Sequence, residues 1–324
     1  MVYAKEIKEN IASKAWNSAH AASLFSNPIF LQNMGYKLTY IGGYKNEELV
    51  LVWPIINSDQ KTNYIPPFSY YFGPFFIDNN MSRAPYKAYK NNLEVTTCVI
   101  DYILKLIQNV SCSLVPEFID IRPFQWWNYD NPKLPQFHIN VKYTARYFLN
   151  NSLDSDLIIS SFRPDDKRKK IKKNLSNKLI KVVTHSKRDT DQLIELYCNT
   201  MLRTGSNPTN TDLNHLRKFF QLSQKSLNSF KIKIIEIQSE KKNELLGYQL
   251  LMIGKKHCYA IAQCVSNEGR KLDGNIRLTY ESICLSKDLG CSVFDFNGAN
   301  SPNRADDKHA FGAKVVPYYE VFVK

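Results

Sequence analysis

The chain has 324 residues, 44% of them hydrophobic and 13% aromatic, which is enough material for two ordinary domains with packed cores. Its longest apolar runs, such as Leu49 to Trp53, have the length of a strand, and its N-terminus lacks the apolar core of a secretory signal. The formal net charge of +13 suits tRNA, a nucleotide-linked substrate or a peripheral contact with an anionic membrane face. We therefore expect a cytoplasmic protein without a transmembrane segment.

The cysteines are seven in number and contain no CxxC pair. They are Cys98, Cys112, Cys198, Cys258, Cys264, Cys284 and Cys291. An odd, scattered set indicates reduced and mostly buried thiols, not a disulfide framework or a zinc site. We expect no bound metal.

In the first half, an N-terminal helical stretch precedes a strand at Glu48 to Ile56 and an irregular aromatic segment at Tyr64 to Phe76. The apolar residues of Leu93 to Gln108 have helical spacing, and Phe118 to Phe124 has the pattern of a strand. The predicted order is strand, irregular segment, helix, strand.

The second half repeats this order. A helix at Thr190 to Leu202 precedes strands at 230–237, 244–254 and 257–265, and a helix from Asn275 ends at Gly290 before a strand at 292–299. Asp120 and Asp295 then occupy equivalent places. The repetition indicates a duplicated α/β fold of mixed sheets, with its seam near Asn150 in a polar run, and the tail 315–323 alternates like a further strand.

Five segments, taken in order, carry a resemblance to a known family. They are "DDKRKKIKKNLSNK" (165–178), "TMLRTG" (200–205), "HCYAIAQCV" (257–265), "GNIRLTYESICLSKDLGCSVFDFNG" (274–298) and "KHAFG" (308–312). Together they resemble the second domain of the FemABX-like acyltransferases, which are built from two tandem GNAT-type domains. The first domain matches more loosely, through "WPII", "PPFSYYFGP" and "IDIRP". The resemblance is to the short branch without the helical-hairpin insertion, and Asp307 stands where the family often has phenylalanine.

The resemblance implies two GNAT-like domains, at 1–150 and 151–314, with the strand 315–324 returning to the first. It also implies direct transfer of an activated acyl group from an aminoacyl-tRNA or acyl-CoA to an amine. Such a transfer needs no covalent nucleophile, and the sequence has no GxSxG, Walker A or HExxH motif. By analogy, the acceptor is a small-molecule or nucleotide-linked cell-envelope precursor, such as a peptidoglycan precursor or an amino sugar of a surface polysaccharide.

Three residues are the catalytic candidates that the resemblance implies. Lys308, in a polar and exposed loop, would place its ammonium near a donor phosphate or the developing oxyanion at the junction of the two domains. Asp295 would orient a lysine or accept a proton, and Tyr259 would donate its hydroxyl to the acyl carbonyl. The alternatives are a solvated lysine, a turn-capping aspartate and a packed tyrosine.

The remaining candidates would bind substrate. Arg203 would bind a phosphate or carboxylate in bidentate fashion, or else favour a helix end. Arg168 and Lys172 would hold tRNA or the donor phosphates from a basic helix whose apolar stripe is Ile171, Leu175 and Leu179, or else belong to a solvated face. Asn275 begins the predicted helix of the second domain. Tyr70, Tyr71 and Arg122 would line the acceptor cleft, or else belong to an aromatic core.

Two other functions stay open. A CoA-dependent GNAT N-acetyltransferase normally has a Gln/Arg-x-x-Gly-x-Gly/Ala loop that opens a helix and binds pyrophosphate. Here Lys271-x-x-Gly274 is present, but Ile276 takes the place of the small residue. A non-enzymatic basic RNA-binding protein would agree with the charge, although no RRM, KH or zinc-knuckle pattern is present.

Overall fold

The structure is a computed structural model that describes residues 1–19, 21–57, 62–77, 85–150, 152–184, 188–301 and 307–323. Its contacts divide the chain into two units. The first unit contains Met1–Lys142 and Pro317–Lys324, and the second contains Tyr143–Val316. The C-terminal strand therefore ends in the first unit.

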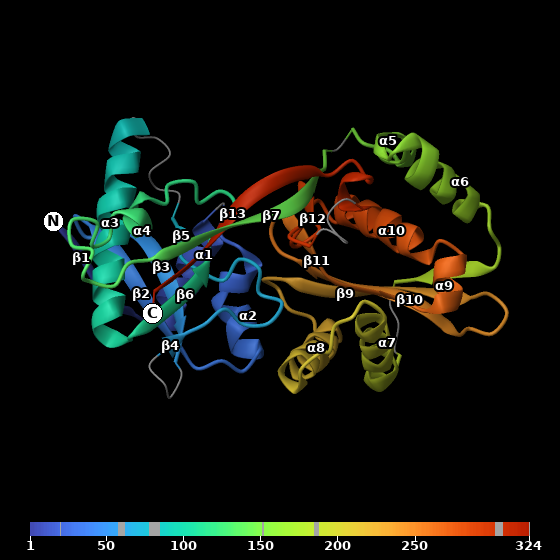
Figure 1. Ribbon diagram of the computed structural model, residues 1–324, viewed down its shortest axis with the longest axis horizontal. Helices are drawn as coiled ribbons and strands as arrows, with labels where there is room; N and C mark the ends of the chain where they lie inside the picture. Colours follow the sequence, from blue (N-terminus) through green and yellow to red (C-terminus); the bar gives the residue numbers. More distant parts are fainter. Residues whose placement is uncertain are drawn as a thin grey trace. The chain divides into compact units, whose positions relative to one another are not determined.

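The first unit is a mixed α/β unit in which one long helix covers a sheet. Its elements are β1 (Val2–Ile7), α1 (Glu9–Ser18), η1 (Leu24–Ser26), α2 (Pro28–Asn33), β2 (Leu38–Lys45), β3 (Glu48–Ile56), β4 (Thr62–Asn63), β5 (Phe75–Phe76), α3 (Pro85–Leu106), β6 (Asn109–Ser113) and α4 (Arg122–Gln125). Four strands form a sheet in the order β1-β2-β3-β5, and β6 pairs with both β4 and the C-terminal strand β13 (Lys314–Val323). Helix α3 packs across β1, β2 and β3 (Figure 1). A Cβ atom at Gly43 would lie 2.6 Å from side-chain carbons of Val95 and Val99, so a glycine lets α3 approach β2 this closely.

The second unit has helices on both faces of one sheet. Its elements are β7 (His138–Phe148), which begins in the first unit, α5 (Ser155–Ser161), the π-helical turn η3 (Pro164–Arg168), α6 (Lys169–Leu175), β8 (Ile180–Val183), α7 (Thr190–Arg203), α8 (Asn210–Ser223), β9 (Lys231–Ser239), β10 (Leu245–Ile253), β11 (His257–Val265), α9 (Asn267–Lys271), α10 (Gly274–Asp288) and β12 (Val293–Asp295). The strand order is β7-β12-β11-β10-β9-β8, with β11 and β12 parallel and the other pairs antiparallel. Helices α10 and α6 lie on one face and α7 and α8 on the other (Figure 1). Helix α10 buries Ile276, Tyr280 and Ile283 in the core and is followed by Gly290, whose φ is +77° as a terminating glycine requires.

Both units therefore have a strand, two helices, antiparallel strands, a long helix and a further strand in the same order. The α/β fold with mixed sheets that we expected is confirmed. The strand predicted at Phe118 to Phe124 is wrong, because Pro123 lies in the first turn of the short helix α4 and the Asp120 carboxylate accepts the N–H of Arg122. The strand that follows α3 is β6, so Asp120 and Asp295 are not equivalent.

Candidate active site

The centre of the second unit is a place where two parallel strands part. The β11–β12 register joins His257 to Val293, Cys258 to Phe294 and Tyr259 to Asp295. Strand β12 then ends, because the chain turns through Asn297 (φ +50°) and Gly298 (φ +76°), whereas β11 continues to Val265. The Asn297 amide donates to the Ala260 carbonyl across the parting, at 3.2 Å. We call the β11 edge from Ala260 to Val265, bounded by the turn at 296–298, the strand opening.

Asp295 lies at the start of the strand opening and is completely buried. Its carboxylate accepts from the Thr144 hydroxyl at 2.6 Å, from the Asn297 N–H at 2.9 Å and from Arg146 Nε at 2.8 Å. The Arg146 side chain is itself only 5% exposed, so the two form a buried ion pair. These hydrogen bonds fix the end of β12 against β7, so Asp295 holds the turn at 296–298 in place. The sequence analysis did not identify Arg146, which has no local motif.

Lys308 lies beside the same turn. Its ammonium donates to the carbonyl oxygens of Phe296 at 3.2 Å and Asn297 at 3.3 Å, and also to that of Gly298. The expectation of an exposed loop lysine is wrong, because the side chain is half-buried and converges on three consecutive carbonyls. Whether it also contacts a substrate stays a prediction.

The neighbouring Asp307 joins this loop to the basic segment. It forms an ion pair with Lys167, whose side chain is 6% exposed and whose ammonium lies 5.3 Å from the centre of the Phe311 ring. Lys167 also lies 3.5 Å from Asp166. The Lys170 and Arg163 side chains hold the pKa of the Asp166 carboxyl well below its usual range, through hydrogen bonds and charge. The departure from the family pattern at Asp307 therefore supplies the partner of a buried lysine, which the sequence analysis missed.

The basic segment is helical, but its buried stripe differs from the predicted one. Ile171 is buried, whereas Leu175 and Leu179 are 40% and 51% exposed. The buried positions are Lys167, Ile171 and Asn174, and the Asn174 amide donates to the Leu272 carbonyl at 2.6 Å.

Arg168 and Lys172, the predicted anion-binding pair of this segment, have different surroundings. The guanidinium of Arg168 donates to the Ser160 carbonyl, so part of it is used inside the fold. Lys172 is exposed on α6.

The far end of the strand opening brings Arg203 and Asn275 close to the same strand. Arg203, exposed at the end of α7, donates to the Val265 carbonyl at 2.9 Å, and the carbonyl of Asn275 accepts from the Gln263 amide at 3.3 Å. The same Gln263 amide donates to Gln249 and Thr279, each at 3.0 Å. This polar network under the strand was not predicted.

The connection between β11 and α10 already uses several of its backbone N–H groups. The N–H of Gly269 donates to the Ser266 hydroxyl, and those of Arg270, Leu272 and Asp273 donate to carbonyls of residues 266–270. A Cβ at Gly269 would lie 2.4 Å from the Leu246 carbonyl oxygen, so this glycine serves close packing on the sheet. These amides are consequently not available to a pyrophosphate in this conformation.

Tyr259 packs instead of pointing into an open space. It is 2% exposed, and its ring centre lies 5.9 Å from that of His257. Its hydroxyl role stays a prediction.

In the first unit, Tyr70 and Tyr71 both contact the ring of Phe25, whereas Arg122 is held by Asp120. Tyr71 is buried and packs edge-on against Tyr318 at 5.2 Å, while Tyr70, half-buried, contacts the ring of Phe25 at 6.3 Å. Arg122 binds Asp120 through two hydrogen bonds of 2.7 Å. Arg122 also lies 5.3 Å from the ring centre of Trp126.

Three further observations bear on the chemistry and the location of the chain. All seven cysteines are free, and burial raises the pKa of Cys258 and Cys112 far above the ordinary value and that of Cys264 to about 12, so these groups are thiols and not thiolates. Among the described residues, no group of His, Cys, Asp and Glu side chains could hold a metal ion. No described helix is long and apolar enough to cross a membrane.

Comparison with known proteins gives structural matches alone. No family model and no curated protein matches the sequence. A crystal structure of FemX matches with a TM-score of 0.63 at 10% identity, over 98% of this chain and 96% of that one. The tandem GNAT protein from the clavulanic acid biosynthesis pathway has a TM-score of 0.53 at 9% identity, over 100% and 98% of the chains. The structure of L-PGS from Bacillus licheniformis has a TM-score of 0.53 at 9% identity, over 98% and 92%. The likeness confirms the tandem GNAT-type fold and the resemblance to FemABX-like proteins at the level of fold.

Proposed function

We propose that this protein is an acyltransferase of the GNAT type that transfers an activated acyl group to an amine. The observation that carries the proposal is the strand opening, where the β11 edge from Ala260 to Val265 lies outside the β12 register. The carbonyls of Ala260, Ala262 and Val265 at this edge already accept from side chains, and the rest of its backbone groups would bind an extended ligand. The fold shared with FemX and the tandem GNAT protein also supports an acyltransferase of the GNAT type.

The proposed reaction is a direct displacement. The nitrogen of a neutral amine attacks the acyl carbonyl carbon, a C–N bond forms, and the C–O bond of an ester or the C–S bond of a thioester breaks. The amine proton leaves to water or to the departing group. The buried thiols agree with a mechanism that uses no cysteine nucleophile.

The donor that we favour is an aminoacyl-tRNA over an acyl-CoA. Ile276 takes the small-residue position of a pyrophosphate loop, and the amides of Gly269, Arg270, Leu272 and Asp273 are already used inside the β11–α10 connection. The exposed lysines of α6 suit a polyanionic carrier. The acceptors to test first are a peptidoglycan precursor and an amino sugar of a surface polysaccharide.

In this proposal, the predicted catalytic residues Asp295 and Lys308 mainly hold the backbone in place and do not react with the substrate. Asp295 and Lys308 hold the turn that bounds the strand opening, and Arg203 supplies a positive charge at its far end. The turn must stay fixed because small displacements of reacting groups are costly in rate.

Mass spectrometry of the products tests the proposal. The chain is incubated with each acceptor and either charged tRNA or acyl-CoA, and acylated amine is expected with charged tRNA. Arg203→Gln should raise KM for the donor about tenfold, since a charged hydrogen bond is lost. Lys225→Gln, which changes an exposed lysine of the same unit outside the basic segment, should leave KM unchanged. Saturable tRNA binding without any acylated product would instead favour the RNA-binding alternative.

A further inference from the structure

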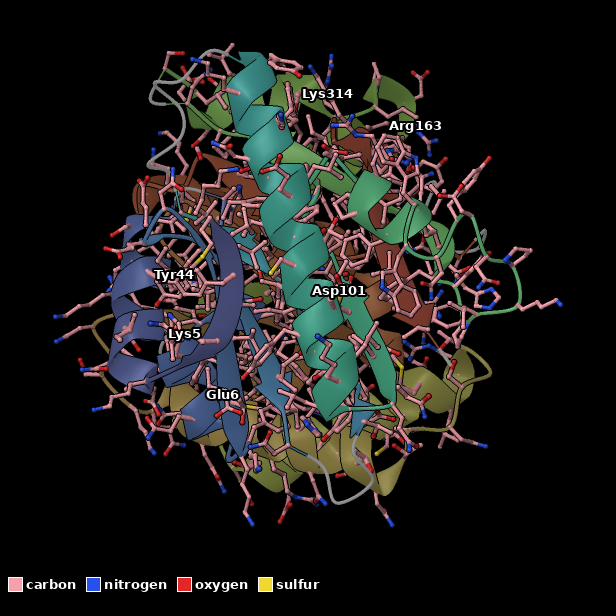
Figure 2. The ribbon with its side chains drawn as sticks, turned by 90° about the vertical axis from the view of Figure 1, so that its left-hand side faces the viewer. Lys5, Glu6, Tyr44, Asp101, Arg163 and Lys314 are labelled. Atoms are coloured by element: carbon pink, nitrogen blue, oxygen red, sulfur yellow. The ribbon has the colours of Figure 1, made fainter. Side chains whose placement is uncertain are left out.

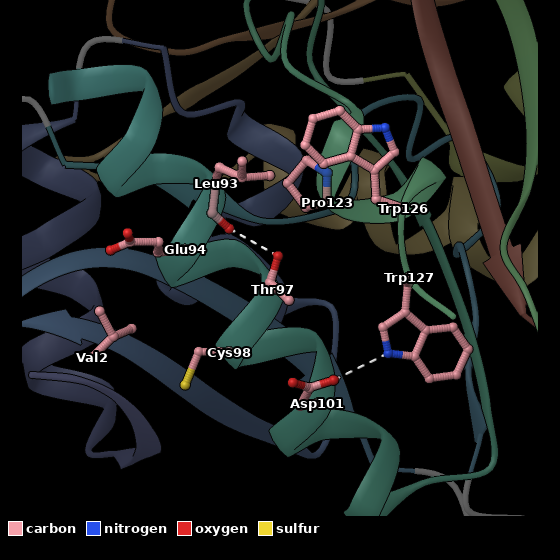
Figure 3. A pocket seen from close by; sticks show the side chains of 9 residues that line it. All are labelled: Val2, Leu93, Glu94, Thr97, Cys98, Asp101, Pro123, Trp126 and Trp127. Atoms are coloured by element: carbon pink, nitrogen blue, oxygen red, sulfur yellow. Dashed lines mark hydrogen bonds between the residues drawn. The ribbon is translucent and has the colours of Figure 1, made fainter. Parts of the chain in front are cut away.

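The first unit has a cavity that the proposed acyl transfer does not use. It has a volume of about 610 Å³, within the range of small-molecule sites, and lies between α3, α4 and β1 (Figure 3). Helix α3 lines it with residues that include Glu94, Cys98 and Asp101, and Pro123, Trp126 and Trp127 come from α4 and the residues after it. Figure 2 shows Asp101 in the C-terminal half of α3, in the same view as Lys5 and Glu6 on β1 and Tyr44 on β2.

The two carboxylates of the cavity have different surroundings. Glu94 forms an ion pair with Lys45 and lies 4.0 Å from Lys90, and the Lys45 hydrogen bond and charge lower the pKa of its carboxyl. Asp101 has a different partner, since it accepts from the Trp127 indole N–H at 3.1 Å. Within the described part of the chain, no cationic side chain forms an ion pair with Asp101. Among the described residues its negative charge is therefore oriented by the indole without an ion-pair partner, while the positive charge of Lys105 acts on the neighbouring Cys98 thiol.

The aromatic wall is also unusual for this chain. Trp16 and Trp53 are buried in the core, whereas Trp126 is 53% exposed beside the cavity. The Trp126 indole already attracts one cation, since the Arg122 guanidinium lies 5.3 Å from its ring centre. Tryptophan has the ring face that attracts cations best. The cavity therefore has the exposed Trp126 indole near Pro123 as a stacking surface and, beside Trp127, the Asp101 carboxylate as a counter-charge (Figure 3).

We propose that this cavity binds a small organic cation, an ammonium attached to a flat or apolar group. The ammonium would contact Asp101, and the apolar group would pack on Trp126 and Pro123. The two carboxylates disfavour an anion even though the whole chain is strongly basic. A neutral ligand could stack on the indoles but would leave the Asp101 charge unpaired. This proposal does not depend on the acyl-transfer proposal.

Titration of the tryptophan fluorescence, with calorimetry in parallel, tests the idea on the full chain. The probes are 2-phenylethylammonium, its neutral counterpart 2-phenylethanol and the anion 3-phenylpropionate. We expect saturable binding of the cation and an affinity at least about tenfold weaker for the two other probes, because neither of them can form a charged hydrogen bond with Asp101. Equal affinity for the cation and the alcohol would overturn the proposal.

Variants assign the effect to the cavity. Asp101→Asn should weaken binding of the cation about tenfold or more and bring it close to that of the alcohol. Glu6→Gln, which removes an exposed carboxylate on β1 outside the cavity, should keep the affinity of the original chain. Trp126→Leu should lose most of the affinity, with Trp127 still reporting the binding that is left. Unchanged binding in Asp101→Asn would contradict the proposal.

A second measurement does not rely on fluorescence. Cys98 lines the cavity and is half-buried, so its rate of alkylation can be followed by peptide mass mapping. A saturating concentration of the cation should slow alkylation of Cys98 several-fold and leave that of Cys198, a half-buried cysteine on α7 of the second unit, unchanged. Equal slowing at both cysteines, or at neither, would argue against a ligand in this cavity.

Discussion

Replacement of Lys308 by methionine removes one positive charge and three converging hydrogen bonds from the turn at 296–298. Methionine keeps a similar length and apolar stem, so the change isolates the ammonium. The carbonyls of Phe296, Asn297 and Gly298 would then have to find water or stay unpaired.

The expected loss of stability follows from these contacts. A hydrogen bond to a charged group contributes about 1.5–3 kcal/mol, and the three bonds share one half-buried ammonium that water can replace in part. We therefore expect Lys308→Met to lower the free energy of unfolding by about 2–3 kcal/mol. Turnover should fall on the order of a hundredfold, because the turn bounds the strand opening. Lys308→Arg should restore only part of both, since a planar guanidinium cannot direct one nitrogen at three carbonyls.

The assay must report on the second unit. All four tryptophans lie in the first unit, so urea unfolding is best followed by circular dichroism. Amide hydrogen exchange adds a local readout at Phe296, whose N–H donates to the Ala145 carbonyl at 2.9 Å, and at Gly298, whose N–H donates to the Thr144 hydroxyl at 3.3 Å. Both amides should exchange faster in the variant.

Lys225→Met is the matched control, because Lys225 is exposed in the same unit, lies outside the basic segment and should change neither property when it is replaced. If Lys308→Met unfolds at the same urea concentration as the original chain and its exchange is unchanged, the ammonium does not hold the turn.

Three more predictions test the surroundings of the site. Asp295→Ala should lower the free energy of unfolding in urea by about 3–5 kcal/mol, because it leaves the buried Arg146 without its partner. The further change Arg146→Met should recover much of that loss, and an additive loss in the double variant would contradict the pairing. Asp166→Asn should lower Tm at neutral pH. The folded pKa of Asp166 lies below the ordinary 3.8, so the stabilisation by its carboxylate is complete above about pH 4 and is lost as the pH falls further. The difference in Tm between the two chains should therefore shrink at low pH, and a constant difference from pH 7 to pH 3 would refute the prediction. Changing the exposed Lys169 and Lys172 to glutamate should weaken tRNA binding and reduce the slope of log K against log salt concentration by about 1 to 2, whereas a charge reversal at exposed Lys133 should not. An equal slope in both variants would show that α6 is a solvated face without a role in tRNA binding.

Some elements of the fold were predictable because their signal is local. The segment 257–265 is β11, Glu48 to Ile56 is β3, and the helix that ends before Gly290 is α10. Apolar periodicity and a glycine that tolerates positive φ depend on near neighbours in the chain, so the sequence contains them directly. The ordered set of motifs also predicted the tandem GNAT-type fold.

Other local patterns misled. The alternation in Phe118 to Phe124 suits a strand, but Pro123 and the hydrogen bonds of Asp120 favour a turn and the short helix α4, and the shorter strand β6 pairs with β13 instead. A strand forms where a partner is available, and the partner here is at the other end of the chain. Neighbouring residues do not contain that information.

In the candidate site, too, some features follow from the local sequence and others depend on residues far away in the chain. The sequence alone determined that Asp295 lies in a strand, that Lys308 follows it and that a basic helix opens the second half, whereas the strand ends earlier than predicted and Lys308 lies in a helical turn at 307–309. Only the tertiary structure decided what these charges do, because their partners are distant: Arg146 lies 149 residues before Asp295, and the buried Lys167 meets Asp307. A charge removed from water must be paired, and packing of the whole chain determines which charges are removed from water.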